Sequence, residues 1–282
     1  MSSLYKPSQL KDFLSAHNRK PKKSLSQVFL TDQNILKKIV RVADIQNDET
    51  LVEIGPGPGA LTAFLLQRSS DVIVIEKDKF YASQLANQPN ITVFQDDILD
   101  FDFSQLVHLS KGKKIKIVAN IPYHISSAIV AKILYHQDII DSAVLLVQKE
   151  FAKRLCAKTN EKDYGSLTVF AQFYADVKTL FSVSKNSFFP IPSVDSAVIQ
   201  MIPKKQLPLP ISECLAFEKF YRTAFSQRRK MLTSSLSELI AKPALETALD
   251  TCGFKSTARP QELTYLELLE LYKALKPVFK EM

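Results

Sequence analysis

The sequence predicts an α/β protein: a mainly parallel, doubly wound sheet of seven strands with an antiparallel C-terminal edge, followed by a small all-helical domain. Two observations lead to this prediction. Through residue 147, short apolar runs alternate with amphipathic helical segments, which is the pattern of a sheet covered by helices. After the proline-rich stretch 203–210, only helical patterns follow.

The strands are predicted from short apolar runs, because strands buried on both faces read as nearly continuous hydrophobic segments. The five parallel strands are expected at 51–54, 71–76, 91–95, 114–119 and 142–147. Two later runs, 177–184 and 196–202, resemble an antiparallel pair, and the segment 188–192 bridges them.

Helices are predicted where apolar residues recur at spacings of three and four. In the sheet domain they are expected at 33–42, 60–66, 79–86, 128–135, 149–157 and 164–174. In the last part of the chain they are expected at 213–225, 228–239, 243–251 and 264–275, with Gly253 ending the third of these.

Three domains are expected. Residues 1–23 are rich in Lys and Arg and predict a flexible basic arm with room for one short helix at 7–16. The sheet domain is expected to cover 24–205 and the helical domain 206–282. The arm has no apolar core like that of a signal peptide.

Composition argues against several classes of protein. The 282 residues are 46% hydrophobic and 23% charged, which is enough for one large core and a smaller domain, and no apolar run has the length of a membrane span. Three distant cysteines and four scattered histidines predict neither a disulfide framework nor a metal site. We therefore expect a cytoplasmic protein, and the net charge of +8 favours a polyanionic partner.

Residues 51–62 carry the first functional signal, because a strand enters a loop with three glycines, beginning at Gly55, and then a helix. Glycine lets the backbone approach a ligand closely, and a helix start offers unpaired N–H groups. A tight structural turn is the alternative for this loop alone. Pro56 and Pro58 remove two backbone donors, so the loop suits a pyrophosphate badly and a nucleoside such as S-adenosylmethionine well.

Acidic residues follow the second and third predicted strands. Glu76 comes about twenty residues after the first glycine, the spacing at which a carboxylate binds ribose hydroxyls. A solvated carboxylate at a strand end is the alternative. At Asp96 and Asp97 a carboxylate could accept the exocyclic amine of an adenine, or it could cap a turn.

The tetrapeptide Asn-Ile-Pro-Tyr at 120–123 follows the fourth strand. The oxygen of Asn120 and a neighbouring main-chain carbonyl can each accept a hydrogen from an adenine N6, which directs the nitrogen lone pair at a sulfonium methyl. Tyr123 offers a face on which the base stacks, and Pro122 makes the turn rigid. A strand-to-helix turn with a core tyrosine is the alternative for this motif alone. Phe188 offers a second aromatic wall, whereas Phe189 is expected in the core.

A basic cluster in the helical part favours an RNA backbone as partner. It is expected on one side of a helix and comprises Arg222, Arg228, Arg229 and Lys230. An ordinary solvated helix face is the alternative.

The chain resembles the ribosomal RNA adenine N6,N6-dimethyltransferases of the kasugamycin-resistance type, which act on small-subunit rRNA. The resemblance extends from about residue 20 to residue 275. It depends on the segments 26–32, 52–62, 75–78, 95–98, 120–126, 147–155, 163–167, 188–198 and 225–232.

The resemblance implies a Rossmann-like class I methyltransferase fold and S-adenosylmethionine as the methyl donor. The residues implied at the donor site are Val28, Leu30, Gly55, Glu76, Asp97, Ile98 and Asn120. The residues implied around the target base are Asn120, Pro122, Tyr123 and Phe188. Val28 stands where the family usually has Asn, so only main-chain contacts carry over there, and His124 also replaces a commoner Asn.

The activity implied is dimethylation of two adjacent adenines near the 3′ end of 16S rRNA, in an assembling small subunit, by a monomeric enzyme. Two alternatives remain. One is a macrolide-resistance methyltransferase of large-subunit rRNA, against which the segment 228–232 and the long helical tail argue. The other is a non-catalytic RNA-binding assembly or transcription factor, against which the intact Asn-Ile-Pro-Tyr motif argues.

Overall fold

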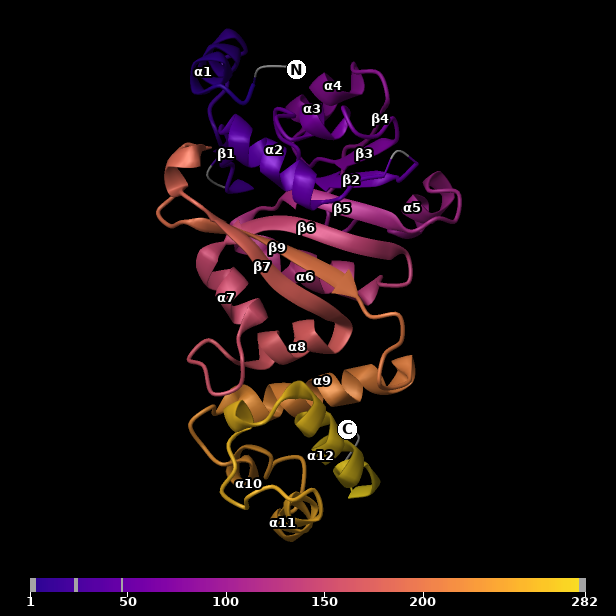
Figure 1. The fold of residues 1–282 in the computed structure, drawn as a ribbon, viewed down its shortest axis with the longest axis vertical. Helices are drawn as coiled ribbons and strands as arrows, with labels where there is room; N and C mark the ends of the chain where they lie inside the picture. The colour runs from indigo at the N-terminus through magenta and orange to yellow at the C-terminus, as the bar shows by residue number, and fades with distance from the viewer. Residues whose placement is uncertain (1–3, 23–24, 47, 279–282) are drawn as a thin grey trace. The chain divides into compact units, whose positions relative to one another are not determined.

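The computed structural model of the chain describes residues 4–22, 25–46 and 48–278, which form two compact units (Figure 1). The first unit contains Met1–Ala152 and Lys178–Pro203, and the second contains Lys153–Val177 and Lys204–Met282. The second unit therefore includes residues 153–177, which the sequence pattern placed in the sheet domain. The cause is the packing of helix α8 (Ser166–Tyr174) on α9 (Ile211–Ser226) through aromatic rings such as Phe173 and Phe217, whose centroids lie 5.2 Å apart.

The first unit is organised by a seven-stranded sheet in the order β4-β3-β2-β5-β6-β9-β7 (Figure 1). Its strands are β2 (Leu51–Ile54), β3 (Val72–Ile75), β4 (Ile91–Phe94), β5 (Ile115–Asn120), β6 (Ile140–Gln148), β7 (Ala175–Val183) and β9 (Ser196–Pro203). The pairings from β4 to β6 are parallel and β6–β9 is antiparallel, which confirms the predicted class I methyltransferase sheet. The strand order reverses at β2 and β5, so a ligand crevice is expected at their carboxyl ends.

Short helices connect the strands of this unit. They are α1 (Pro7–Ala16), α2 (Gln33–Val42), α3 (Thr62–Leu65), α4 (Lys79–Ala86), α5 (Ser104–Leu109) and α6 (Ser126–Tyr135), with α7 (Lys149–Cys156) crossing into the second unit. Aspartate side chains fix two of the starts: Asp32 accepts the backbone N–H of Asn34, and Asp78 that of Phe80. Within the described residues, no helix is long and apolar enough to cross a membrane.

The N-terminal segment is packed rather than a free arm. Helix α1 forms where the short helix was expected and buries Leu10 and Leu14 against Phe29 and Tyr81. The described residues 4–22 therefore belong to the first unit, and the expectation of a flexible arm is wrong for them. Residues 1–3 and 23 lie outside the described residues.

A two-stranded antiparallel sheet joins segments far apart in the sequence. β1 (Phe29–Leu30) pairs with β8 (Phe188–Phe189), with Leu30 opposite Phe188. Sequence periodicity does not predict these strands, because two residues are too few to show an alternation. The pairing holds residues 25–30 beside the carboxyl end of the large sheet.

The second unit is helical after β9, with α9, α10 (Leu232–Ser235), α11 (Lys242–Thr251) and α12 (Tyr265–Leu275). Gly253 has a φ of +72° just after α11, which confirms it as the helix stop. The helix expected at 228–239 is wrong. The backbone leaves helical geometry at Gln227, so residues 228–230 lie in a turn before the single helical turn α10, whereas Arg222 lies on α9. The Arg228 side chain donates to the carbonyls of Glu161 and Lys162.

Candidate active site

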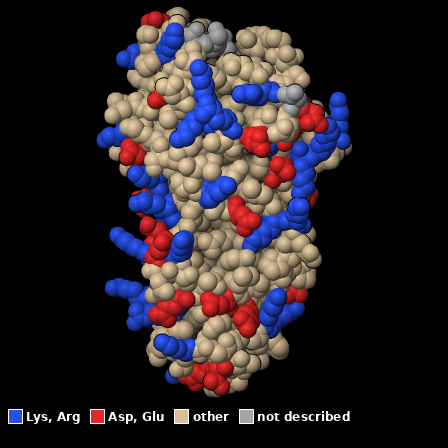
Figure 2. All heavy atoms as spheres, viewed as in Figure 1, with Lys and Arg blue, Asp and Glu red and all other residues tan. Residues whose placement is uncertain are grey.

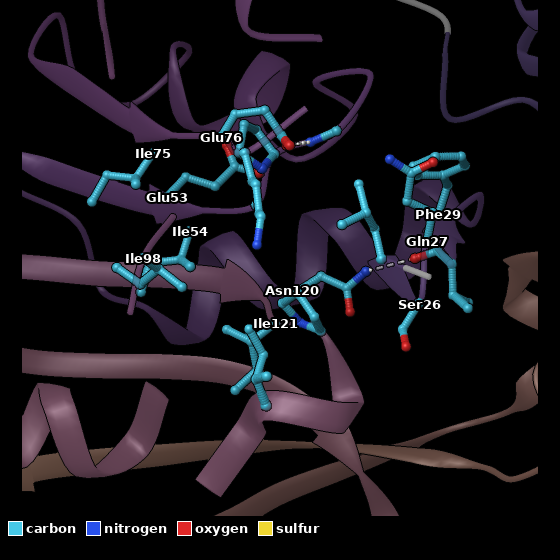
Figure 3. Close-up of a pocket in the computed structure, with 18 of the residues that line it drawn as sticks. Ser26, Gln27, Phe29, Glu53, Ile54, Ile75, Glu76, Ile98, Asn120 and Ile121 are labelled. Carbon is cyan, nitrogen blue, oxygen red and sulfur yellow. Dashed lines mark hydrogen bonds between the residues drawn. The ribbon is translucent and has the colours of Figure 1, made fainter. Parts of the chain in front are cut away.

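A cavity of about 310 Å³ lies at the carboxyl ends of β2, β3 and β5, inside the first unit (Figure 3). Its walls come from five segments, 25–30, 53–61, 75–77, 96–99 and 120–125. The structure brings together here the residues Val28, Leu30, Gly55, Glu76, Asp97, Ile98, Asn120, Pro122 and Tyr123. All predicted donor-site residues therefore share one cavity with most of the predicted base-binding residues.

Glu76 holds the glycine loop in place. Its carboxylate accepts the N–H of Gly57 at 2.9 Å on one oxygen and the N–H of Asp78 at 2.7 Å on the other. Burial raises the pKa of Glu76, and these two N–H groups oppose the rise. A carboxylate has about four acceptor positions, so each oxygen can still accept a ribose hydroxyl.

Gly57 admits no side chain at this point. Its φ is +54°, and a Cβ built there would lie 2.9 Å from the ring of Phe29. The ring therefore lies directly against the loop, which explains why glycine is needed here. Through this contact the loop also supports β1, the strand that contributes Leu30 to the cavity.

Glu53 lines the same cavity and was missed as a site residue by the sequence reasoning. It is 2% exposed in the middle of β2, and Thr62 donates to it at 2.6 Å. Burial raises the pKa of Glu53 to about 8, the Thr62 hydrogen bond lowers it, and the nearby Glu76 adds to the rise. The carboxyl group is therefore largely protonated at pH 7. The sequence signal that could have identified Glu53 is an acidic residue inside an otherwise apolar strand.

Asp97 both caps a turn and lines the cavity, so the two interpretations of this position are compatible. One carboxylate oxygen accepts the N–H of Leu99 at 3.0 Å and the other pairs with Lys77 at 2.5 Å. Burial raises the pKa of Asp97, but the hydrogen bond and charge of Lys77 outweigh it and the pKa is lowered. Ile98, 6% exposed, supplies an apolar wall beside it.

Asn120 ends β5 with its amide turned toward the cavity (Figure 3). Its nitrogen donates to the carbonyl of Val28 at 3.1 Å, which assigns the other amide atom as oxygen. That oxygen accepts no hydrogen bond from the described residues. The Val28 contact is therefore made by main chain, and it aims an acceptor at the space where a base would enter.

The turn after Asn120 leaves a second acceptor. The carbonyl of Pro122 accepts the hydroxyl of Ser126 at 3.0 Å, whereas the carbonyl of Ile121 accepts no hydrogen bond from any described residue. Tyr123 begins the 3₁₀ turn Tyr123–Ile125 and is half-buried. Its hydroxyl lies 2.7 Å from the hydroxyl of Ser196, and burial raises its pKa while that hydrogen bond opposes the rise.

Phe188 lies away from the cavity. It is 2% exposed within the core cluster that also contains Leu30, and it is absent from the cavity walls, whereas Phe189 is half-buried under Lys11. Phe188 therefore lies in the core instead of beside the cavity, and Phe189 packs against the cluster around Leu10 and Leu14, so neither ring lines the cavity. Stacking of Phe188 on a base would require its ring to leave this core.

The basic cluster belongs to the second unit and is divided by its contacts. Arg228 is committed to the main-chain carbonyls of residues 161 and 162, and Arg222 pairs with Glu218 at 3.4 Å. Arg229 and Lys230 are exposed. On the face in Figure 2, Lys and Arg side chains are interspersed with Asp and Glu, so this face has no broad patch of one sign.

Known proteins resemble this chain over nearly its whole length. The family model described as ribosomal RNA adenine dimethylase matches residues 18–276. Ribosomal RNA small subunit methyltransferase A of Protochlamydia amoebophila is 39% identical, covering 96% of this chain and 97% of that protein. The protein of the same name from Geobacillus kaustophilus is 36% identical, with 97% of each chain covered.

Solved structures of two methyltransferases also resemble this chain. A dimethyladenosine transferase from Plasmodium falciparum has a TM-score of 0.76 at 27% identity, covering 88% of this chain and 98% of that one. The 23S rRNA methyltransferase ErmE has a TM-score of 0.66 at 27% identity, covering 88% and 99%. From its sequence match and from the arrangement of its cavity, the chain belongs to the ribosomal RNA adenine dimethylase family.

Proposed function

We propose that this protein transfers methyl groups from S-adenosylmethionine to N6 of two adjacent adenines near the 3′ end of 16S rRNA, in an assembling small subunit. The amide of Asn120 carries the proposal, because its fixed orientation leaves an oxygen facing the donor cavity. Full-length similarity to small-subunit methyltransferases supports the substrate. We also propose that the enzyme acts as a monomer in the cytoplasm.

The cavity fits the methyl donor. Glu76 would hold the ribose, Gly55 allows close approach of the backbone, and Ile98 beside Asp97 offers an apolar wall and an acceptor for the adenine. When bound, S-adenosylmethionine supplies an electrophilic methyl group on a sulfonium.

The target amine is activated by position. An adenine N6 is a poor nucleophile, because its lone pair is delocalised into the ring. The oxygen of Asn120 and the carbonyl of Ile121 can each accept one of its hydrogens, which turns the lone pair out of the ring plane and toward the methyl group. Tyr123 stacks on the base and favours the positive charge that develops on the nitrogen.

RNA recognition is proposed to involve the exposed members of the basic cluster. Arg229 and Lys230 have side chains free to reach phosphates, and Arg222 could exchange its partner Glu218 for one. Arg228 is proposed only to hold the turn that presents them. The ErmE likeness shows that an enzyme of large-subunit rRNA shares this fold, so the substrate has to be tested directly.

Replacing Asn120 by Ala tests this mechanism. The variant should bind S-adenosylmethionine with nearly unchanged affinity by calorimetry but lose methyl transfer by at least about 100-fold, since a preorganised acceptor is removed.

Primer extension on 16S rRNA from cells that lack the gene should read through the two adenines, and only the native gene should restore the stops. Asn34→Ala, at an exposed position of α2, is the control. Full activity of Asn120→Ala, or stops on 23S rRNA instead, would refute the proposal.

A further inference from the structure

The hydroxyl of Tyr123 is hydrogen-bonded to a side chain 73 residues later in the sequence. It lies 2.7 Å from the hydroxyl of Ser196, and neither hydroxyl makes another hydrogen bond with the described residues. Ser196 is fully buried at 0% exposure. A buried serine would leave its hydroxyl unsatisfied without this bond, so the contact is part of how the site is held.

The strand direction places Ser196 at the catalytic edge. It is the first residue of β9 and pairs with Gln148, the last residue of β6. Because β9 runs antiparallel, it begins where the parallel strands end, beside the turn that follows β5. The residue before it is also fixed: the carbonyl of Asp195 accepts the N–H of Lys149 and its carboxylate accepts that of Lys185, both at 3.0 Å.

We infer that Ser196 is a positioning residue of the methyl-transfer site, which fixes the outer end of the Tyr123 ring and so its place beside the target adenine. This inference rests on the proposed function, in which Tyr123 stacks on the base. The 3₁₀ turn fixes the ring at its Cβ end, and the hydrogen bond to Ser196 holds the hydroxyl end, which restricts rotation about the Cα–Cβ bond. Stacking needs the ring to lie over the base, so a ring whose outer end can swing away presents the amine to Asn120 in the productive geometry less often.

Ser126 shows that the turn is held by a second, separate contact. Its hydroxyl donates to the carbonyl of Pro122 and its backbone N–H donates to the carbonyl of Tyr123, so both contacts are made to the main chain of the turn and neither to the Tyr123 ring. Loss of Ser126 therefore perturbs the main chain of the turn, whereas loss of Ser196 releases only the ring. Ser196 is thus the position at which ring orientation can be changed while the glycine loop, Glu76 and Asn120 stay in place.

A double-mutant cycle on Ser196 and Tyr123 tests the inference, using the full chain and undermethylated small subunits as substrate. Ser196→Ala and Tyr123→Phe should each lower kcat about three- to tenfold, the size expected for one net hydrogen bond, with the KM for S-adenosylmethionine unchanged. The double variant should be no slower than the slower single variant, because both remove the same contact. Ser142→Ala, another buried serine on β6, should keep the native rate.

The outcomes separate this inference from the proposed function. If the two single effects multiply in the double variant, or if Ser196→Ala has native kcat, the positioning role is wrong while the mechanism stands. If Tyr123→Ala transfers methyl groups at the native rate, stacking on Tyr123 itself is wrong and the proposed function loses that step. Thermal melting of each variant shows whether Ser196→Ala is folded. Should it melt early, Tyr123→Phe, which keeps the ring and the core serine, still has to show the kcat loss.

Discussion

Two buried glutamates, Glu53 and Glu76, line the donor cavity, and their hydrogen-bond partners differ. Glu76 receives two backbone N–H groups, which favour its ionised form. Glu53 receives one hydroxyl and is otherwise enclosed by the sheet, so it keeps its proton near pH 7. At the scale of single residues, burial raises the pKa of both glutamates, and their different hydrogen-bond partners distinguish them.

The titration of Glu53 should be visible in stability. Its folded-state pKa of about 8 lies above the ordinary glutamate value of about 4.3, so the folded protein holds a proton that the unfolded chain releases. Stability should then fall as pH rises between these values. Glu53→Gln removes this pH-dependent loss of stability. The difference in melting temperature between Glu53→Gln and the native protein should therefore increase from pH 5 to pH 8, by about 2–4 °C for each kcal/mol that the native protein loses.

Glu76→Gln is the variant to compare with Glu53→Gln. It should weaken S-adenosylmethionine binding at pH 7, whereas Glu53→Gln should leave the affinity nearly unchanged, because Glu53 is already neutral there. A native pH dependence of melting in Glu53→Gln would show that another group is responsible.

At the scale of elements, Asp78 joins the N-terminal segment to the helix that follows β3. Its carboxylate caps α4 at the N–H of Phe80 and pairs with Arg19 at 3.1 Å and Lys22 at 2.8 Å. Gln27, a cavity residue, donates to it at 3.3 Å. One buried carboxylate thus fixes both a helix start and the segment that leads into β1.

Asp78→Ala should destabilise the protein by about 1–2 kcal/mol, the upper range for a lost helix cap, with the partly exposed ion pairs adding little. Burial raises the pKa of Asp78, but Lys22 and the N–H of Phe80 outweigh it and the pKa is lowered. Its stabilisation is therefore present above the ordinary pKa of about 3.9 and is lost as pH falls through the folded value. Urea unfolding at pH 7 and pH 3 measures this difference. Asp12→Ala, at an exposed position, is the control, and an equal loss at both pH values would contradict the assignment.

The elements also show what the sequence can and cannot predict. Strand β2 and helices α2 and α4 have the predicted bounds, because apolar runs and capping aspartates mark them locally. β1 and β8 depend on a partner more than 150 residues away, as their pairing of Leu30 with Phe188 shows, and no local pattern reports it. For the same reason the sequence placed Phe188 at the base and missed the contact between Ser196 and Tyr123.

At the scale of the whole molecule, the net charge of +8 does not form a broad positive patch on the face in Figure 2. Both signs are interspersed on the face in Figure 2, and one member of the predicted basic cluster serves as an internal hydrogen-bond donor. RNA binding should therefore depend on a few exposed cations rather than on the general charge. The sequence could predict that the chain is basic, but not which cations are already engaged by its own carbonyls.

Replacing Arg229 and Lys230 together by Ala should weaken binding to small-subunit rRNA and reduce the steepness of its salt dependence. Each lost phosphate contact lowers the slope of log K against log salt by roughly 0.7–0.9, so the pair should lower it by roughly 1.5. The control is the double variant of Lys255 and Lys273, two exposed lysines of the same unit, which should keep the native slope. Arg228→Ala should instead lower the melting temperature, because the carbonyls of residues 161 and 162 lose their hydrogen-bond donor. Filter binding across a salt series compares this variant with the two double variants. If Arg228→Ala alone flattens the slope while the Arg229 and Lys230 variant does not, the assignment of roles within this cluster is reversed.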